Sequence, residues 1–105
     1  MNIIVYFLYD SDKSIKIGYT KHKEVIKRIN QLKTGSATKI ILLGVIEGNL
    51  DREKEIHKMF KYLNINLEWH LIDESLLNFI NSNNILPVYI EFLDGKLQVY
   101  KTMKK

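Results

Sequence analysis

Two stretches of β-forming residues, separated by a short polar segment, place the strongest constraint on the fold of this chain. Residues from Ile3 to Tyr9 are almost all apolar, which predicts a mostly buried strand. The polar residues that follow, Asp10 to Lys13, are typical of a turn, and Ile15 to Thr20 are predicted to form a second strand. Strands this close in sequence most simply pair as an antiparallel hairpin.

The predicted hairpin brings a phenol and an ammonium group to one face of a sheet. If the loop has an odd length, for example Asp10–Asp12, Tyr6 faces Lys16 across the strands. Lengthening the loop by two residues keeps both side chains on the same face, because side chains alternate with a period of two, whereas an even loop separates them. We therefore expect Tyr6 and Lys16 to lie side by side.

Composition narrows the class of protein. A length of 105 residues suits one domain, and a content of 46% hydrophobic and 27% charged residues is ordinary for a globular protein. The absence of cysteine excludes disulfides and thiolate zinc sites and fits a reducing, intracellular setting. No signal-peptide layout and no apolar run of membrane-spanning length is present, so we expect no membrane partner. The net charge of +4 slightly favours a polyanionic partner.

The rest of the chain alternates between helical and strand patterns. The spacing of apolar residues and the turn signals predict a helix, a strand, two further helices and a second hairpin. These elements are expected over Lys21–Lys33, Lys39–Ile46, Asn49 or Asp51 to about Leu63, Asp73–Ile80, and Val88–Leu93 with Lys96–Lys101 around Asp94-Gly95. Asn49 or Asp51 is expected to cap the second helix, and Asp73 the third. A short irregular or extended piece is expected at Asn64–Ile72. This order predicts a small α+β sandwich with a mainly antiparallel sheet.

Two charged residues border or enter the apolar stripes of the predicted helices. Arg28 lies next to the stripe of the first helix, where a side chain with its stem on the edge of the core is the ordinary interpretation. Glu53 falls inside the stripe of the second helix, three residues before Ile56. It is either a first-turn carboxylate favoured by the helix dipole or a ligand for a hard cation, and the sequence leaves both open.

Further acids, histidines and an aromatic residue accompany Glu53. His57 follows it by one helical turn, a spacing that suits ligation or orientation, although partly exposed helix histidines are common. Glu68, Trp69 and His70 lie in the short connector after this helix, and Trp69 is expected to fill the core rather than stack on a base.

Taken together, these residues resemble the GIY-YIG nuclease superfamily. Val5-Tyr6 is similar to the end of its first motif, with Ile4 in the place of the usual glycine, and Lys16-Ile17-Gly18 is similar to its second motif with lysine in place of tyrosine. Arg28 and Glu53 stand where the family has its helix arginine and its metal-binding glutamate. The Lys-Ile-Gly form is similar to a branch of short phage, viral and bacterial proteins. The resemblance covers about Ile4 to Ile80.

The resemblance implies a fold and a reaction. The fold would be a central three-stranded antiparallel sheet flanked by helices, with residues 1–82 as the nuclease domain and residues 83–105 as a C-terminal β-hairpin. The reaction would be hydrolysis of a DNA phosphodiester with one divalent ion, Mg²⁺ or Mn²⁺. Glu53 would hold the metal, Arg28 would bind the scissile phosphate, and Tyr6 would activate water with the help of Lys16, because an adjacent ammonium lowers the pKa of a phenol. The residues expected to bind substrate are Tyr19, Thr20, His57, Glu68 and Trp69.

Some consequences of the resemblance stay open. The asparagine that the family carries late in the domain has three competing counterparts, Asn64, Asn66 and Glu68. The expected partner is DNA, double-stranded or branched, in the cytoplasm or in a host cell, and a homodimer is left open. A DNA-binding module of the same fold that does not cut is the first alternative. A protein-interaction domain that uses an edge strand of the C-terminal hairpin is the second.

Overall fold

The predicted opening hairpin forms, with a register two residues away from the simplest one. The computed structural model describes residues 3–10, 14–21, 24, 27 and 40–102. Strand β1 (Ile3–Asp10) pairs antiparallel with β2 (Ser14–Lys21), and Tyr6 lies opposite Gly18 while Leu8 lies opposite Lys16. The direct pairing of Tyr6 with Lys16 is therefore wrong, because pairing begins at Asp10 and Ser14. The prediction that both side chains share one face is confirmed, since a two-residue shift preserves the alternation.

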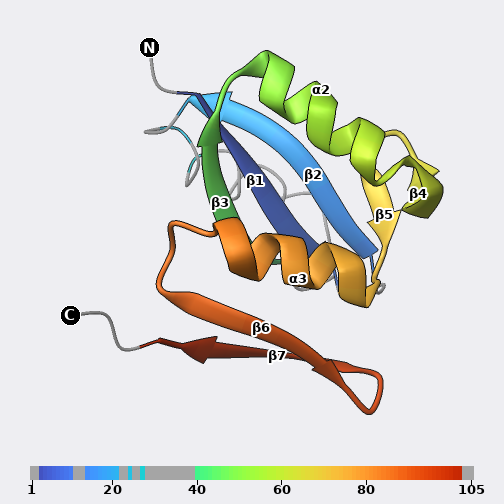
Figure 1. Ribbon diagram of the computed structural model, residues 1–105. Helices are drawn as coiled ribbons and strands as arrows, with labels where there is room; N and C mark the ends of the chain where they lie inside the picture. Colours follow the sequence, from blue (N-terminus) through green and yellow to red (C-terminus); the bar gives the residue numbers. More distant parts are fainter. Residues whose placement is uncertain (1–2, 11–13, 22–23, 25–26, 28–39, 103–105) are drawn as a thin grey trace.

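The central sheet has five strands, in the order β3-β1-β2-β5-β4, rather than the three expected (Figure 1). Strand β3 (Ile40–Gly48) forms where the apolar run predicted a strand, and it pairs antiparallel with β1. The two extra strands, β4 (Asn64–Asn66) and β5 (Trp69–Leu71), come from the connector that was expected to be irregular or extended. Each has three residues, too few to show a periodic pattern, and β5 is extended because it pairs with Ser14–Lys16 at the edge of β2.

Two helices follow their predicted caps. Helix α2 (Leu50–Met59) begins at Asn49, whose Oδ1 accepts from the Arg52 backbone N–H at 2.9 Å, and the short 3-10 helix Lys61–Leu63 continues it. Helix α3 (Glu74–Asn83) begins at Asp73. The helix expected over Lys21–Lys33 does not begin at Lys21, which belongs to β2, and the rest of that range lies outside the described residues apart from positions 24 and 27. No helix of the described part is both long and apolar enough to cross a membrane.

Both helices pack on the same face of the sheet and enclose the main core. Val5, Phe7 and Ile17 point into this core from the sheet, because they occupy alternate positions that share one face. The helices contribute Ile56, Phe60, Leu76, Leu77 and Ile80. The other alternate positions point to the opposite face, where Tyr6 and Leu8 pack with Ile40 in a smaller apolar cluster.

The C-terminal hairpin forms a separate two-stranded sheet beside α3 (Figure 1). Strands β6 (Val88–Leu93) and β7 (Lys96–Lys101) have the predicted bounds, and Asp94 and Gly95 between them have φ angles of 52° and 76°. Asn81 fastens the hairpin to α3, because its Nδ2 donates to the Ile90 carbonyl and its Oδ1 accepts from the Ile90 N–H, both at 2.8 Å. The hairpin is thus tied to the helix by side-chain hydrogen bonds.

Candidate metal centre

Glu53 is a buried carboxylate in the first turn of α2. The cap at Asn49 sets the start of the helix, so Glu53 lies one turn before the fully buried Ile56 and faces the sheet with it. Only 8% of Glu53 is exposed, which confirms that it lies within the apolar stripe. Burial of a charged carboxylate costs on the order of several kcal/mol unless another group compensates the charge.

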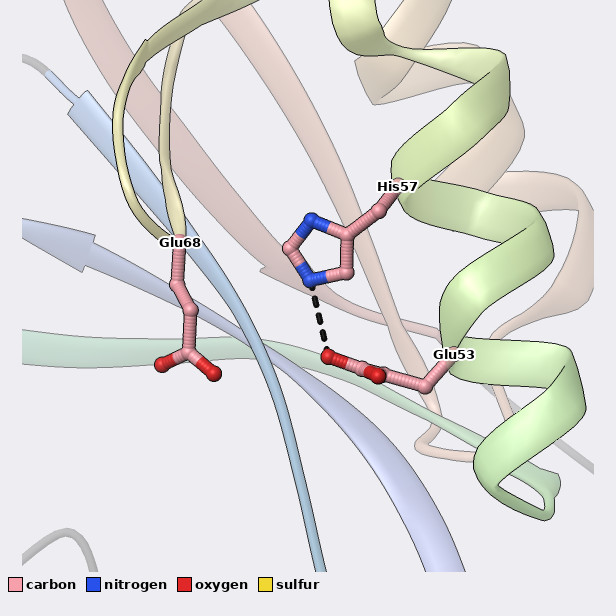
Figure 2. A group of neighbouring side chains, drawn as sticks. All are labelled: Glu53, His57 and Glu68. Atoms are coloured by element: carbon pink, nitrogen blue, oxygen red, sulfur yellow. Dashed lines mark ion pairs between the residues drawn. The ribbon is translucent and has the colours of Figure 1, made fainter.

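His57 supplies that compensation from the next turn of the same helix. Its Nε2 lies 2.8 Å from Glu53 Oε2 and 3.1 Å from the backbone carbonyl oxygen of Ile17 on β2 (Figure 2). Both neighbours are oxygen acceptors, so in this arrangement Nε2 carries a proton and donates to them. The histidine therefore ties the acid of α2 to the strand that carries the Lys-Ile-Gly motif.

Glu68 approaches the same place from the turn between β4 and β5 (Figure 2). Its backbone carbonyl accepts hydrogen bonds from the Ile17 N–H at 2.9 Å and from His70 Nδ1 at 3.0 Å, which fix the turn against β2. Its carboxylate points toward Glu53, and Lys16 Nζ lies 3.5 Å from Glu68 Oε1. A second acid and a lysine thus join the pair on α2.

The three side chains Glu53, His57 and Glu68 could hold one metal ion. One ligand atom from each lies within 4.8 Å of the other two. Ligands on opposite sides of an octahedral ion are about 4.2 Å apart, because each bond is about 2.1 Å long. Small side-chain movements would therefore suffice for one divalent cation to reach all three ligands.

His70 supports this centre from inside the protein, although it was not among the residues predicted for the site. It is fully buried, its ring lies 5.3 Å from that of His57, and its Nε2 has no hydrogen-bond partner among the described residues. Burial lowers its pKa, the charge on His57 lowers it further, and the hydrogen bond to the Glu68 carbonyl acts in the opposite direction. The neutral ring donates from Nδ1 to that carbonyl. The signal in the sequence is that His70 follows Glu68 by only two residues in the same short connector.

Tyr6 reaches the hairpin from the other face of the sheet. Its side chain is buried beside Leu8, and its ring lies over Gly18, where a Cβ added to the glycine would come within 2.6 Å of the phenolic oxygen. The glycine of the Lys-Ile-Gly motif is therefore needed for the position of the phenol. Lys16 shares the face of Tyr6 and contacts Glu68, so it connects the phenol's side of β2 with the acidic cluster.

The remaining predicted residues have different surroundings. Tyr19 is 42% exposed, whereas Thr20 is 9% exposed, on the opposite face of β2. Trp69 is half-buried opposite Lys16, and not in the core as expected. Arg28 lies outside the described residues. Of the three candidates for the late asparagine, Asn64 braces the β4–β5 turn through hydrogen bonds to the Leu67 and Trp69 carbonyls.

No protein-family model, no curated protein and no solved structure matches this chain.

Proposed function

We propose that this chain is a metal-dependent endonuclease of the GIY-YIG type that hydrolyses DNA phosphodiester bonds. The single observation that carries the proposal is the buried Glu53, which lies with His57 and Glu68 beside the Lys-Ile-Gly strand. A buried acid that faces two further ligand-type side chains is characteristic of a metal centre rather than of a solvated helix surface. Its position next to β2 agrees with the motif resemblance.

Each residue has a role in this proposal. Glu53 holds a divalent ion, Mg²⁺ or Mn²⁺, and His57 and Glu68 complete its protein ligands. Such an ion, when bound, supplies charge stabilisation at the phosphate. As the family resemblance implies, Tyr6 would accept the proton of the attacking water with the help of Lys16, which shares its face of the sheet. Arg28 would bind the scissile phosphate, as the family resemblance implies.

One observation favours a second candidate, a DNA-binding module of the same fold that does not cut. The Glu53 carboxylate is already compensated, because His57 Nε2 lies 2.8 Å from it. To bind a metal through that nitrogen, His57 must give up the proton that it shares with Glu53 and the Ile17 carbonyl. If the proton stays, the acid has a structural partner and the fold retains its DNA-binding surface alone.

Incubation with supercoiled and branched DNA separates the two candidates. The protein is incubated with Mg²⁺ or Mn²⁺ and, in a parallel reaction, with excess chelator. We expect nicking that needs the metal and is lost in Glu53→Gln. The matched control is Glu55→Gln, since Glu55 is an exposed acid of the same helix that pairs with Arg52. Salt-sensitive binding without nicking would establish the module, and nicking by Glu53→Gln at the wild-type rate would refute the assigned centre.

A further inference from the structure

A hollow next to the candidate metal centre is lined by positive and neutral side chains. It has a volume of about 330 Å³ and lies where helix α2 ends, beside the turn between β4 and β5. Its lining residues are His57, Lys58, Lys61, Asn64, Leu67 and His70.

The charge of this hollow distinguishes it from other hollows on the described surface. None of its six lining residues is acidic, and Lys58 and Lys61 are both exposed, so their ammonium groups can reach a ligand. A second hollow, beside the start of α2, contains Asp51 and Glu55, and a third, between α3 and β6, contains Asp73, Glu74 and Glu91. The hollow at the end of α2 is therefore suited to an anion.

His57 connects this hollow with the acidic cluster. Its Nε2 faces Glu53 Oε2, and His57 is also one of the residues that line the hollow. The other ring nitrogen points away from Glu53 (Figure 2). The hollow and the candidate metal centre thus share His57, so a single extended ligand with two negative groups can contact both.

We propose that this hollow binds a phosphate group that flanks the scissile one on the same nucleic-acid strand. The inference rests on the proposed function, because that function places the scissile phosphate at the neighbouring cluster. Phosphates repeat at every nucleotide along a strand, and lysine binds them as a point charge. Lys58 and Lys61 hold this second phosphate and set the position of the strand relative to Glu53.

The salt dependence of DNA binding tests the proposal. Binding of a duplex oligonucleotide is measured in chelator, so that nothing is cut, for the wild type, Lys58→Ala/Lys61→Ala and Lys96→Ala. Each lost phosphate contact reduces the slope of log K against log salt by about 0.9. Both lysines hold one phosphate, so between about 50 and 200 mM salt the affinity advantage of the wild type over the double variant should shrink by roughly 3.5-fold. Lys96 lies on the hairpin beyond α3 and is the control for loss of positive charge (Figure 1).

Two further measurements make the outcome decisive. Lys58→Arg/Lys61→Arg retains both charges and should restore the wild-type slope, and Mn²⁺ affinity by electron paramagnetic resonance should be unchanged in the alanine double variant. A double variant with the wild-type slope, or a Lys96→Ala loss of equal size, overturns the proposal. If the wild type binds and nicks DNA in either of those cases, only the phosphate site fails. A wild type that neither binds nor nicks overturns the proposed function together with it.

Discussion

Substitution of Gly18 by alanine tests how the second motif positions the phenol. Gly18 is not among the described residues with a positive φ, so its backbone conformation is available to alanine and the effect is steric. The added Cβ would lie 2.6 Å from both Cζ and the phenolic oxygen of Tyr6. The ring cannot swing away freely, because Tyr6 is 2% exposed and packs with Leu8 and Ile40.

The size of the effect follows from overpacking a buried site. One extra methyl group in a well-packed core costs about 1–3 kcal/mol. For a domain of this length about 1 kcal/mol corresponds to roughly 4 °C in Tm, so Gly18→Ala should lower Tm by roughly 4–12 °C. Thermal unfolding followed by circular dichroism measures the shift. If the proposed function holds, nicking should fall more than DNA binding, because the phenol is displaced while the surface charges are retained.

A double-mutant cycle identifies the Tyr6 ring as the cause. In a Tyr6→Val background the ring is gone, so the additional cost of Gly18→Ala should be small and the two changes should be strongly non-additive. An equal Tm loss in both backgrounds would show that the methyl group meets something other than Tyr6. An unchanged Tm for Gly18→Ala alone would refute the close approach of the ring to β2.

Three further predictions concern a buried histidine, a helix cap and the hairpin. Burial holds the pKa of His70 below its ordinary value of 6.5, so as the pH falls the unfolded chain binds a proton at this histidine before the folded protein does. The stability contributed by neutral His70 is therefore complete above pH 6.5 and is lost as the pH falls below it. Urea unfolding in chelator should show that His70→Gln reduces this acid sensitivity, and parallel pH profiles would contradict it. Asp73→Ala should cost about 1 kcal/mol at neutral pH through loss of the α3 cap, whereas Asp73→Asn should cost little. The hydrogen bonds of the Asp73 carboxylate hold its pKa below 3.8, so the stability difference between the wild type and Asp73→Ala should disappear in acid as this group protonates. A stability difference that stays constant with pH would argue against the cap. Asn81→Ala leaves the buried Ile90 backbone groups unpaired and should cost about 1–3 kcal/mol, with faster hydrogen exchange across residues 88–101. Asn83→Ala, which loses a bond within its own helix, should leave that exchange unchanged, and equal exchange in both variants would refute the role of Asn81.

Local patterns in the sequence were sufficient wherever an element is decided by its own residues. The Asp94-Gly95 hairpin was predicted with its strand bounds, because Asp-Gly is one of the few residue pairs that favour a two-residue loop with positive φ angles. The N-cap of α3 at Asp73 and the burial of Glu53 were predicted for the same reason: a cap and an apolar stripe are both readable from spacing. The shared face of Tyr6 and Lys16 followed from strand alternation alone.

Tertiary pairing decided the features that the sequence did not reveal. Trp69–Leu71 forms a strand because it pairs with the edge of β2. A segment of three residues is too short for a sequence pattern that would predict this pairing. That pairing in turn brings Glu68 to Ile17 and positions its carboxylate near Glu53. His57 was visible one turn after Glu53, but its contact with the Ile17 carbonyl depends on how α2 crosses β2. The sequence therefore indicates that Glu53 and His57 are neighbours, but not that Glu68 joins them.

The cluster also explains how one small domain tolerates a buried acid. Glu53 faces the core side of the sheet at a point where β2 continues past the end of β5, so the Ile17 carbonyl beside it accepts from a histidine rather than from a strand. A proton on His57 satisfies both oxygens, and a divalent ion between Glu53, His57 and Glu68 would replace that proton with a larger charge. We therefore expect the fold to be stable without metal, since the His57 contact compensates the acid when no ion is bound. A metal ion that binds through His57 must displace the proton shared with Glu53, and this displacement reduces the affinity for the metal. The nuclease and the binding module are therefore distinguished by whether nicking depends on metal, and not by the stability of the fold.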